Sequence, residues 1–336
     1  MKKILSRAIL LFLFFSFEFS LVVFSNNELL NKNCSLDTVI QKLGFCEEKQ
    51  KSSFKRLCSC AGVELPDNFD TKLLLELVMK TQRAFTNRKD KQERWEITPL
   101  DWMKNNPQQY LQDIKTLGFT DDVLPKSKKY GAVCILGAVN STMKYRMKFI
   151  EKLVDSGFEV SRIFLLSGER YVSHVDGSDE EILGICQKFN VSKENLTEAH
   201  LIQNIFDDSI LSKNYKSILI DTPSYNGSRP TTKTTVKDFC KWVKENNFED
   251  DVLFVSSQPN IFYQESIISK VLNDEDLKIK FEVVGPKTGS LDIQTLVGAM
   301  GSYLWAIMPK IISEFGFDIK SPEEVKMFKT LYGCQL

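Results

Sequence analysis

Histidine is scarce in this chain, and its scarcity excludes several kinds of catalytic centre. Only His174 and His200 occur among 336 residues. A metal site built from several imidazoles is therefore excluded. Neither histidine stands in a sequence order that indicates a nucleophile with its base and orienting carboxylate. We accordingly predict no metal site, and the sequence indicates no particular cofactor.

Glycine-rich phosphate loops and an excess of one charge are also missing. No Walker loop is present, and residues 137–140 (Gly-Ala-Val-Asn) are not the glycine fingerprint of dinucleotide-binding proteins. The 44 Lys plus Arg residues balance 44 Asp plus Glu residues. Since a neutral balance gives no electrostatic footprint for nucleic acid, we expect no nucleic-acid partner.

Residues 1–25 have the pattern of a segment that directs export. Cations at the start precede an apolar run over residues 8–17, and a second apolar stretch leads to Ser25. This order is typical of a cleaved signal peptide. An uncleaved membrane anchor is the alternative, because residues 4–24 are long enough to span a bilayer. We expect a periplasmic, secreted or membrane-anchored protein.

Half of the eight cysteines crowd near the N-terminus, at positions 34, 46, 58 and 60. An even number of cysteines in an exported chain permits disulfides. A zinc site is the alternative, but Cys58-Ser59-Cys60 is the only close pair, and zinc knuckles use pairs two to four residues apart. We therefore predict one or two disulfides in this region. Cys134 and Cys240 are predicted to be buried thiols.

Residues 26–125 form a predicted helical region that carries these cysteines. Apolar residues recur at helical spacing, and Asp70 is a suitable N-cap for the helix that follows it. The charged stretch at residues 86–94 is interpreted as a solvated linker or helix surface. Helices are predicted over residues 37–43 and 71–83, with a further short helix within residues 99–118.

Short apolar runs alternate with helical stretches in the rest of the chain, residues 126–336. The first four runs are continuous, as expected for strands that are buried on both faces. We therefore predict a three-layer Rossmann-like α/β domain with a mainly parallel sheet of about five strands. A last apolar helix, near 291–308, is predicted to pack on the sheet. The runs are 132–136, 163–166, 217–220, 252–255 and 281–284, and the other helices lie near 143–156, 178–189, 198–206, 232–246 and 261–272.

Ligands of open parallel sheets bind beyond the carboxyl ends of the strands, so residues that follow the runs are candidate ligand-binding residues. Gly137 and Arg146 follow the first run, and a guanidinium there suits a carboxylate or phosphate. A surface arginine or a structural ion pair is the alternative for Arg146. Ser167 and Gly168 follow the second run, where they offer a hydroxyl and a close backbone approach, or simply a tight turn.

Glu198 begins the helix before the third run. The helix dipole alone favours an acid in this position, and the functional alternative is a hydroxyl acceptor or a general base. If the protein is an enzyme, Glu198 is the predicted catalytic residue.

Residues 221–235, after the third run, are the most unusual stretch. Threonines crowd at the start of a helix, and Arg229 and Lys233 lie beside them. Hydroxyls, free backbone N–H groups and cations make an anion cradle, although N-capping by threonine explains part of the pattern. We predict that Arg229, Thr232 and Thr235 bind ligand. Ser256 and Asn260, after the fourth run, complete the predicted site.

The order of these signals resembles the YdcF/SanA/ElyC-like family of envelope-associated Rossmann-like proteins over residues 130–285. The residues that carry the resemblance are Gly137 with Arg146, Ser167 with Gly168, Glu198 with Ala199, Thr232 with Thr235, and Ser256-Ser257 with Asn260. The resemblance implies a nucleotide-like or S-adenosylmethionine-like ligand and an envelope role. Four positions depart from the family pattern: Glu169 replaces a Gly, Thr235 an Asn, Asn260 a His and Tyr263 an Arg.

Together these patterns predict an exported or anchored α/β protein that binds a small anionic or nucleotide-like ligand at the carboxyl edge of its sheet. Transfer or hydrolysis at a phosphate or sugar is the favoured chemistry if the protein is an enzyme. The alternative is a non-catalytic envelope or secreted interaction protein, in which residues 26–125 supply the surface for a protein partner.

Overall fold

The computed structural model describes residues 33–86, 97–225, 228–287, 289, 292–317, 319 and 321–332. The segment predicted to direct export, residues 1–25, lies outside the described residues, as does most of the charged stretch at residues 86–94.

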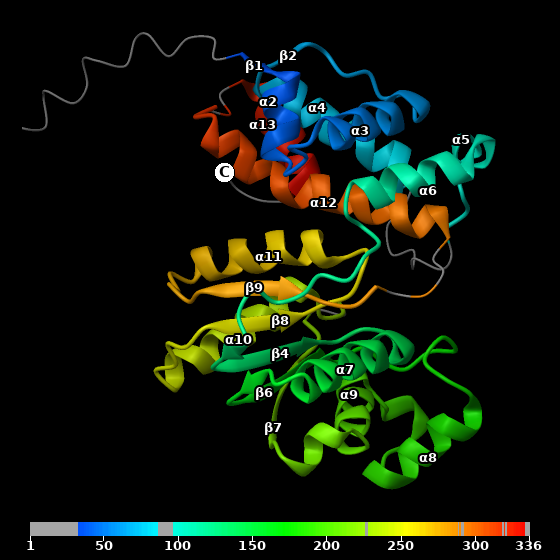
Figure 1. The fold of residues 1–336 in the computed structure, drawn as a ribbon, viewed down its shortest axis with the longest axis vertical. Coiled ribbons are helices and arrows are strands. Elements are labelled where there is room, and N and C mark those ends of the chain that lie inside the picture. The colour runs from blue at the N-terminus through cyan, green and yellow to red at the C-terminus, as the bar shows by residue number, and fades with distance from the viewer. Residues whose placement is uncertain are drawn as a thin grey trace, which may run out of the picture.

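A five-stranded sheet forms the centre of the α/β domain, in the order β7-β6-β4-β8-β9 (Figure 1). All of its neighbouring strands are parallel, which confirms the predicted Rossmann-like architecture. The chain builds from β4 outward to β7 and then returns to the other side of β4, so the strand order reverses between β4 and β8. The strands are β4 (Ala132–Leu136), β6 (Ile163–Gly168), β7 (Ser217–Thr222), β8 (Val252–Val255) and β9 (Phe281–Val284).

Burial along the strands follows their position in the sheet. Strands β4, β6 and β8 are buried throughout, as their continuous apolar runs predict. The same prediction was wrong for β7, whose residues are mostly half-buried or exposed. This strand lies at the edge of the sheet, where one side has no neighbouring strand to cover it.

Helices cover both faces of the sheet and complete three layers. Alternate side chains of β4 point to opposite faces, so Val133 and Ile135 pack into one core while Cys134 and Leu136 pack into the other. The first core is covered by α7 (Asn140–Asp155), α8 (Asp179–Phe189) and α9 (Glu198–Asp207), and the second by α10 (Thr232–Glu245) and α11 (Ile261–Asp274).

A second, helical body lies beside α11 in Figure 1, and we call it the helical cap. It has its own core, in which Phe54, Phe85 and Phe119 are fully buried. Asp70 caps α4 as predicted, since its carboxylate accepts a hydrogen bond from the Leu73 amide. The cap consists of α2 (Leu36–Lys42), α3 (Glu48–Cys60), α4 (Thr71–Thr81), η1 (Gln82–Thr86), α5 (Asp101–Asn105), α6 (Pro107–Thr116), α12 (Ile293–Glu314) and α13 (Pro322–Tyr332).

The region predicted to hold one short helix, residues 99–118, contains two. Two helices, α5 and α6, replace the single short helix predicted within residues 99–118, because Pro107 starts a new helix at its first position. The remaining short elements are β1 (Cys34–Ser35) paired with β2 (Asn68–Phe69), β3 (Lys129–Tyr130) paired with β5 (Glu159–Val160), and the 3₁₀ turns η3 (Lys193–Asn195) and η4 (Ile210–Lys213).

Helix α12 packs in the cap, so the prediction that it packs on the sheet was wrong. Its apolar residues join the core of the N-terminal helices, and α11 lies between it and β9 (Figure 1). Among the described residues, α12 is the one helix long and apolar enough to cross a membrane, but 61% of its most apolar window is buried inside the protein. These properties are those of a core helix. Phe119, Phe262 and Tyr303 join cap and α/β domain, with ring centroids 5.0–6.0 Å apart.

The cysteines near the N-terminus are free thiols, so the prediction of one or two disulfides among them was wrong. Cys34 lies on β1, where its thiol donates to the Phe69 carbonyl. Cys58 is fully buried on the inner face of α3, whereas Cys46 and Cys60 are exposed. A disulfide needs Cβ atoms about 4 Å apart, and none of these four cysteines is bonded to another. Cys134 and Cys240 are buried thiols, as predicted.

Candidate functional site

A cavity of about 870 Å³ lies at the carboxyl edge of the sheet, and we call it the sheet-edge cavity. Strands β4 and β8 are paired neighbours here, and the strand order reverses between them. Ligands of doubly wound sheets bind in such a crevice. Eight predicted site residues line it: Gly137, Arg146, Gly168, Glu198, Arg229, Thr232, Thr235 and Asn260.

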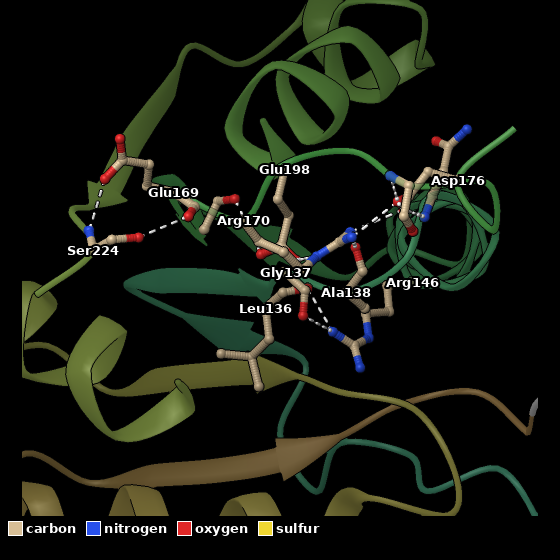
Figure 2. A network of polar contacts seen from close by, with 12 residues as sticks. Leu136, Gly137, Ala138, Arg146, Glu169, Arg170, Asp176, Glu198 and Ser224 are labelled. Carbon is tan, nitrogen blue, oxygen red and sulfur yellow. Dashed lines mark hydrogen bonds and ion pairs between the residues drawn. The ribbon is translucent and has the colours of Figure 1, made fainter. Parts of the chain in front are cut away.

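Arg146 lies in the wall of the cavity with only 2% of its surface exposed. Its Nη1 donates to the carbonyl oxygens of Leu136 and Gly137, at 2.6 and 3.0 Å (Figure 2). Its Nη2 and Nε donate to Ser257 Oγ, at 3.2 and 3.4 Å. The guanidinium thus joins the ends of β4 and β8 across the point where the strand order reverses. The sequence predicted that Arg146 binds ligand, but not that it hydrogen-bonds the ends of the two strands.

The charge of Arg146 is poorly compensated. Within the described residues no carboxylate forms an ion pair with it, and carbonyl and hydroxyl partners carry only partial charges. Burial lowers the pKa of Arg146 to about 10, although Glu198 opposes the shift at longer range. A buried cation is costly unless an anion offsets it. An anion bound in the cavity would therefore stabilise the charged form of Arg146.

Arg170 and two acids form a second buried network beside Arg146 (Figure 2). Arg170 Nε donates to Glu198 Oε2 at 2.9 Å, and its two Nη atoms donate to the two carboxylate oxygens of Asp176, each at 2.9 Å. Burial alone would lower the pKa of Arg170. The carboxylates of Asp176 and Glu198 outweigh this and raise the pKa above its ordinary value. For Asp176, burial raises the pKa, but the bonds from Arg170 outweigh this and hold it below its ordinary value.

Glu198 is the one acid of this network that lines the sheet-edge cavity. It starts α9, and its Oε1 accepts a hydrogen bond of 3.2 Å from Ser167 Oγ. Burial raises the pKa of Glu198, and the bonds from Arg170 and Ser167 oppose this only in part. A raised pKa brings a carboxyl group closer to the range in which general acid–base catalysis is efficient.

Two glycines allow the chain to close around this network. A Cβ atom on Gly137 would collide with Glu198 Oε1, so glycine permits the carboxylate to lie against the end of β4. A Cβ on Gly168 would collide with Pro230, so glycine permits the loop after β7 to lie against the end of β6. Nearby, Glu169 Oε2 accepts the Ser224 amide at 2.8 Å and holds the same loop (Figure 2).

Helix α10 supplies the threonine side of the cavity. Thr231 is its N-cap, and its hydroxyl accepts the Thr234 amide. Thr232 Oγ1 accepts a bond of 3.4 Å from Gln264 of α11, whereas the Thr235 hydroxyl donates to the Thr231 carbonyl at 3.0 Å. Part of the threonine pattern is therefore capping, and Thr232 is the hydroxyl that faces the neighbouring helix across the cavity.

Two predicted residues lie behind the cavity wall. Ser167 is 1% exposed and acts on the site only through Glu198. Ser256 is fully buried and hydrogen-bonds with Gln264, so it supports that side chain. Its neighbour Ser257 lines the cavity instead, because successive residues at a strand end point in opposite directions.

The first turns or caps of five helices meet at the cavity: α7, α9, α10, α11 and α12. Helix N-termini present free N–H groups and the positive end of the helix dipole. Carboxylates of the chain already lie at three of them, Asp176 at α7, Glu198 on α9 and Asp292 at α12, so the ends that favour an anion are those of α10 and α11.

Sequence reasoning missed the wall that the helical cap contributes. Ile97, Asp292, Gln294 and Thr295 line the cavity from the cap side, far in the chain from the strand ends. It also missed Arg170 and Asp176, since an arginine two residues after a strand and an acid in a loop give no distinct signal. Among the described residues, no group of three or more His, Cys, Asp or Glu side chains is placed to hold a metal ion.

Comparison with protein-family models finds no matching family, and comparison with curated proteins finds no match. The inference of function therefore depends on the residues of the cavity.

Proposed function

We propose that the protein binds a small anionic or nucleotide-like ligand in the sheet-edge cavity. The observation that carries this proposal is Arg146, a buried guanidinium that forms no ion pair with a carboxylate of the described residues, in the wall of a cavity that also holds the N-termini of α10 and α11. An anion placed there offsets the desolvation of Arg146. The volume, about 870 Å³, suits a ligand of nucleotide or sugar-phosphate size.

Glu198 is the group best suited to proton transfer if the ligand is a substrate. It combines burial, a raised pKa and a position in the cavity wall. Transfer or hydrolysis at a phosphate or sugar is the chemistry that we propose for this arrangement. The resemblance of Gly137, Arg146, Glu198 and Thr232 to the YdcF-like pattern supports a nucleotide-like ligand, and the pattern of residues 1–25 supports a location outside the cytoplasm or at a membrane.

Calorimetry and thermal-shift assays with inorganic phosphate, AMP, sugar phosphates and S-adenosylmethionine test the proposal. We expect at least one anion to raise the melting temperature, and Arg146→Lys to weaken its binding about tenfold or more, because Lys cannot keep four donor bonds in place. Arg162→Lys is the matched control, since Arg162 is exposed and precedes β6 at the opposite end of the strand.

Two outcomes would contradict the proposal. One is a folded protein that binds none of these anions at millimolar concentration. The other is equal affinity in wild type and Arg146→Lys. If Arg146→Lys does not fold, Thr232→Val tests the same cavity from the α10 side, where we expect about a threefold to tenfold loss.

A further inference from the structure

An exposed aromatic ring lines the sheet-edge cavity, and the proposed anion site does not use it. Tyr145, on the second turn of α7, lines the cavity next to Arg146 in the chain and keeps 49% of its surface exposed. Within the described residues its ring stacks on no other aromatic ring, and its hydroxyl forms no hydrogen bond. A ligand in the cavity can therefore reach this ring.

The position of Tyr145 on α7 explains why its ring lies at the cavity. Thr142, three residues earlier, lines the cavity as well, because residues three apart share one face of a helix. Side chains of a helix lean toward its N-terminus, and the N-terminus of α7 is the end that borders the cavity. Arg146 points instead to the carbonyls of Leu136 and Gly137, at the end of β4. The ring and the cation thus lie at different parts of the same cavity.

The spacing between these two groups suits an extended ligand. Tyr145 lies five residues after Asn140, the first residue of α7, which is about 7.5 Å along the helix axis. The guanidinium of Arg146 lies at the strand end, before the helix begins. A ligand that contacts both therefore needs a spacer of several ångströms between its anionic group and the part that lies at Tyr145. The ribose of a nucleotide is such a spacer.

The cavity also has room and apolar surface beside the anion site. Its volume of about 870 Å³ is far larger than a phosphate group needs. Ile97, Val139 and Val175 line it and are only half-buried, so part of each side chain is accessible. Aromatic and apolar side chains commonly bind the flat, apolar part of a ligand, while a few polar groups orient it. A planar ring fills this space with contacts that a chain of hydroxyl groups does not make.

We infer that Tyr145 stacks on a planar ring of the ligand, which makes a nucleoside phosphate the ligand class of this cavity. The inference rests on the proposed function, because it assumes an anionic group beside Arg146. A nucleobase presents a flat π-face to an aromatic side chain, whereas a sugar phosphate has no such face. Tyr145 is then a specificity-determining residue, and Arg146 stabilises the phosphate that both classes of ligand share.

Calorimetry with AMP and ribose 5-phosphate tests this inference. The two compounds share the phosphate and the ribose, and only AMP has a base. We expect wild type to bind AMP about tenfold more tightly than ribose 5-phosphate or better, the usual order for one base stacked on an aromatic side chain. In Tyr145→Ala the preference falls to about threefold or less, and the affinity for ribose 5-phosphate is unchanged. Tyr145→Phe keeps the preference, because the ring and not the hydroxyl makes the contact.

Tyr171→Ala is the matched control. Tyr171 is also a tyrosine with about half of its surface exposed, 55%, but it does not line the cavity. It should keep the wild-type preference. Alanine favours a helix, and thermal unfolding checks that Tyr145→Ala is folded. Should it fail to fold, Tyr145→Leu replaces it, because leucine keeps an apolar side chain without a planar ring. We expect the same loss of preference.

The failures of the two proposals are distinguishable. Equal binding of AMP and ribose 5-phosphate by wild type, or a preference that survives in Tyr145→Ala, would overturn the stacking on Tyr145 and leave the anion site in place. Absence of binding by either compound and by inorganic phosphate would overturn both.

Discussion

The two sides of the cavity are specified in different ways, although both are needed to enclose it. The strand side consists of turns that follow β4, β6, β7 and β8, and parallel strands bring such turns together whatever their distance in the chain. The cap side depends on α12, which comes after the sheet in sequence but packs with helices that precede it. Topology thus places the first side, and side-chain packing places the second.

The substitution Phe119→Ala tests whether side-chain packing couples the helical cap to the α/β domain. Its ring is fully buried and contacts Phe262 of α11 and Tyr303 of α12. We expect Phe119→Ala to lower the free energy of unfolding by about 3–5 kcal/mol, the usual cost of deleting a buried phenyl ring. Urea denaturation measures it, with Phe239→Ala in the α/β core for comparison. A loss below about 1 kcal/mol for Phe119→Ala would show that cap and α/β domain are not coupled here.

Gly137 tests the strand side. In Gly137→Ala the new methyl group has to displace the Glu198 carboxylate, which Arg170 and Ser167 hold. We expect a loss of about 1–3 kcal/mol in stability, as for other overpacked sites, together with loss of ligand binding. Gly184→Ala in α8 is the control, since no atom lies within 4 Å of its added Cβ, and it should stabilise the helix by up to about 1 kcal/mol. Unchanged stability and binding in Gly137→Ala would contradict the described position of Glu198.

Glu198 gives the strand side of the cavity a pH dependence. Burial raises the pKa of Glu198 in the folded protein above 4.5, its ordinary value. The folded state therefore binds the proton more tightly than the unfolded state does. Stability from this group is therefore present at low pH and is lost as pH rises through the folded pKa. We expect the stability of wild type relative to Glu198→Gln to fall as pH rises above 4.5, by about 1.4 kcal/mol for each unit by which the folded pKa exceeds the ordinary value. Thermal unfolding across this range measures it, and a relative stability that rises with pH would contradict the shift.

The thiols of the cap give the smallest expected effects. Cys46 and Cys60 are exposed, whereas Cys34 and Cys58 are buried, and burial raises the pKa of the Cys58 thiol. Alkylation of the native protein followed by mass spectrometry should modify Cys46 and Cys60 and spare the other two until unfolding. Cys46→Ser should change stability by no more than about 0.5 kcal/mol. A bridged pair among these four positions would contradict the described cap.

Local pattern in the sequence predicted most of the sheet, because five apolar runs with polar turns have few ways to pack. It also predicted Glu198, Thr232 and Arg146 as neighbours, since each follows a strand or starts the next helix. It did not predict that Arg146 bonds to the carbonyls of Leu136 and Gly137, which depends on side-chain direction. Nor did it predict Gln294, because its place follows from α12 packing against the N-terminal helices, and that long-range contact has no local signal.

Crystals soaked in tungstate, a tetrahedral oxyanion with a strong anomalous signal, test the central claim most directly. The proposed function predicts one anomalous peak inside the sheet-edge cavity, within hydrogen-bonding reach of Arg146 or the first turns of α10 and α11, and its loss on competition with phosphate. Tungstate bound only on the outer surface, with the cavity empty at saturating concentration, would contradict an anion site at the end of this sheet.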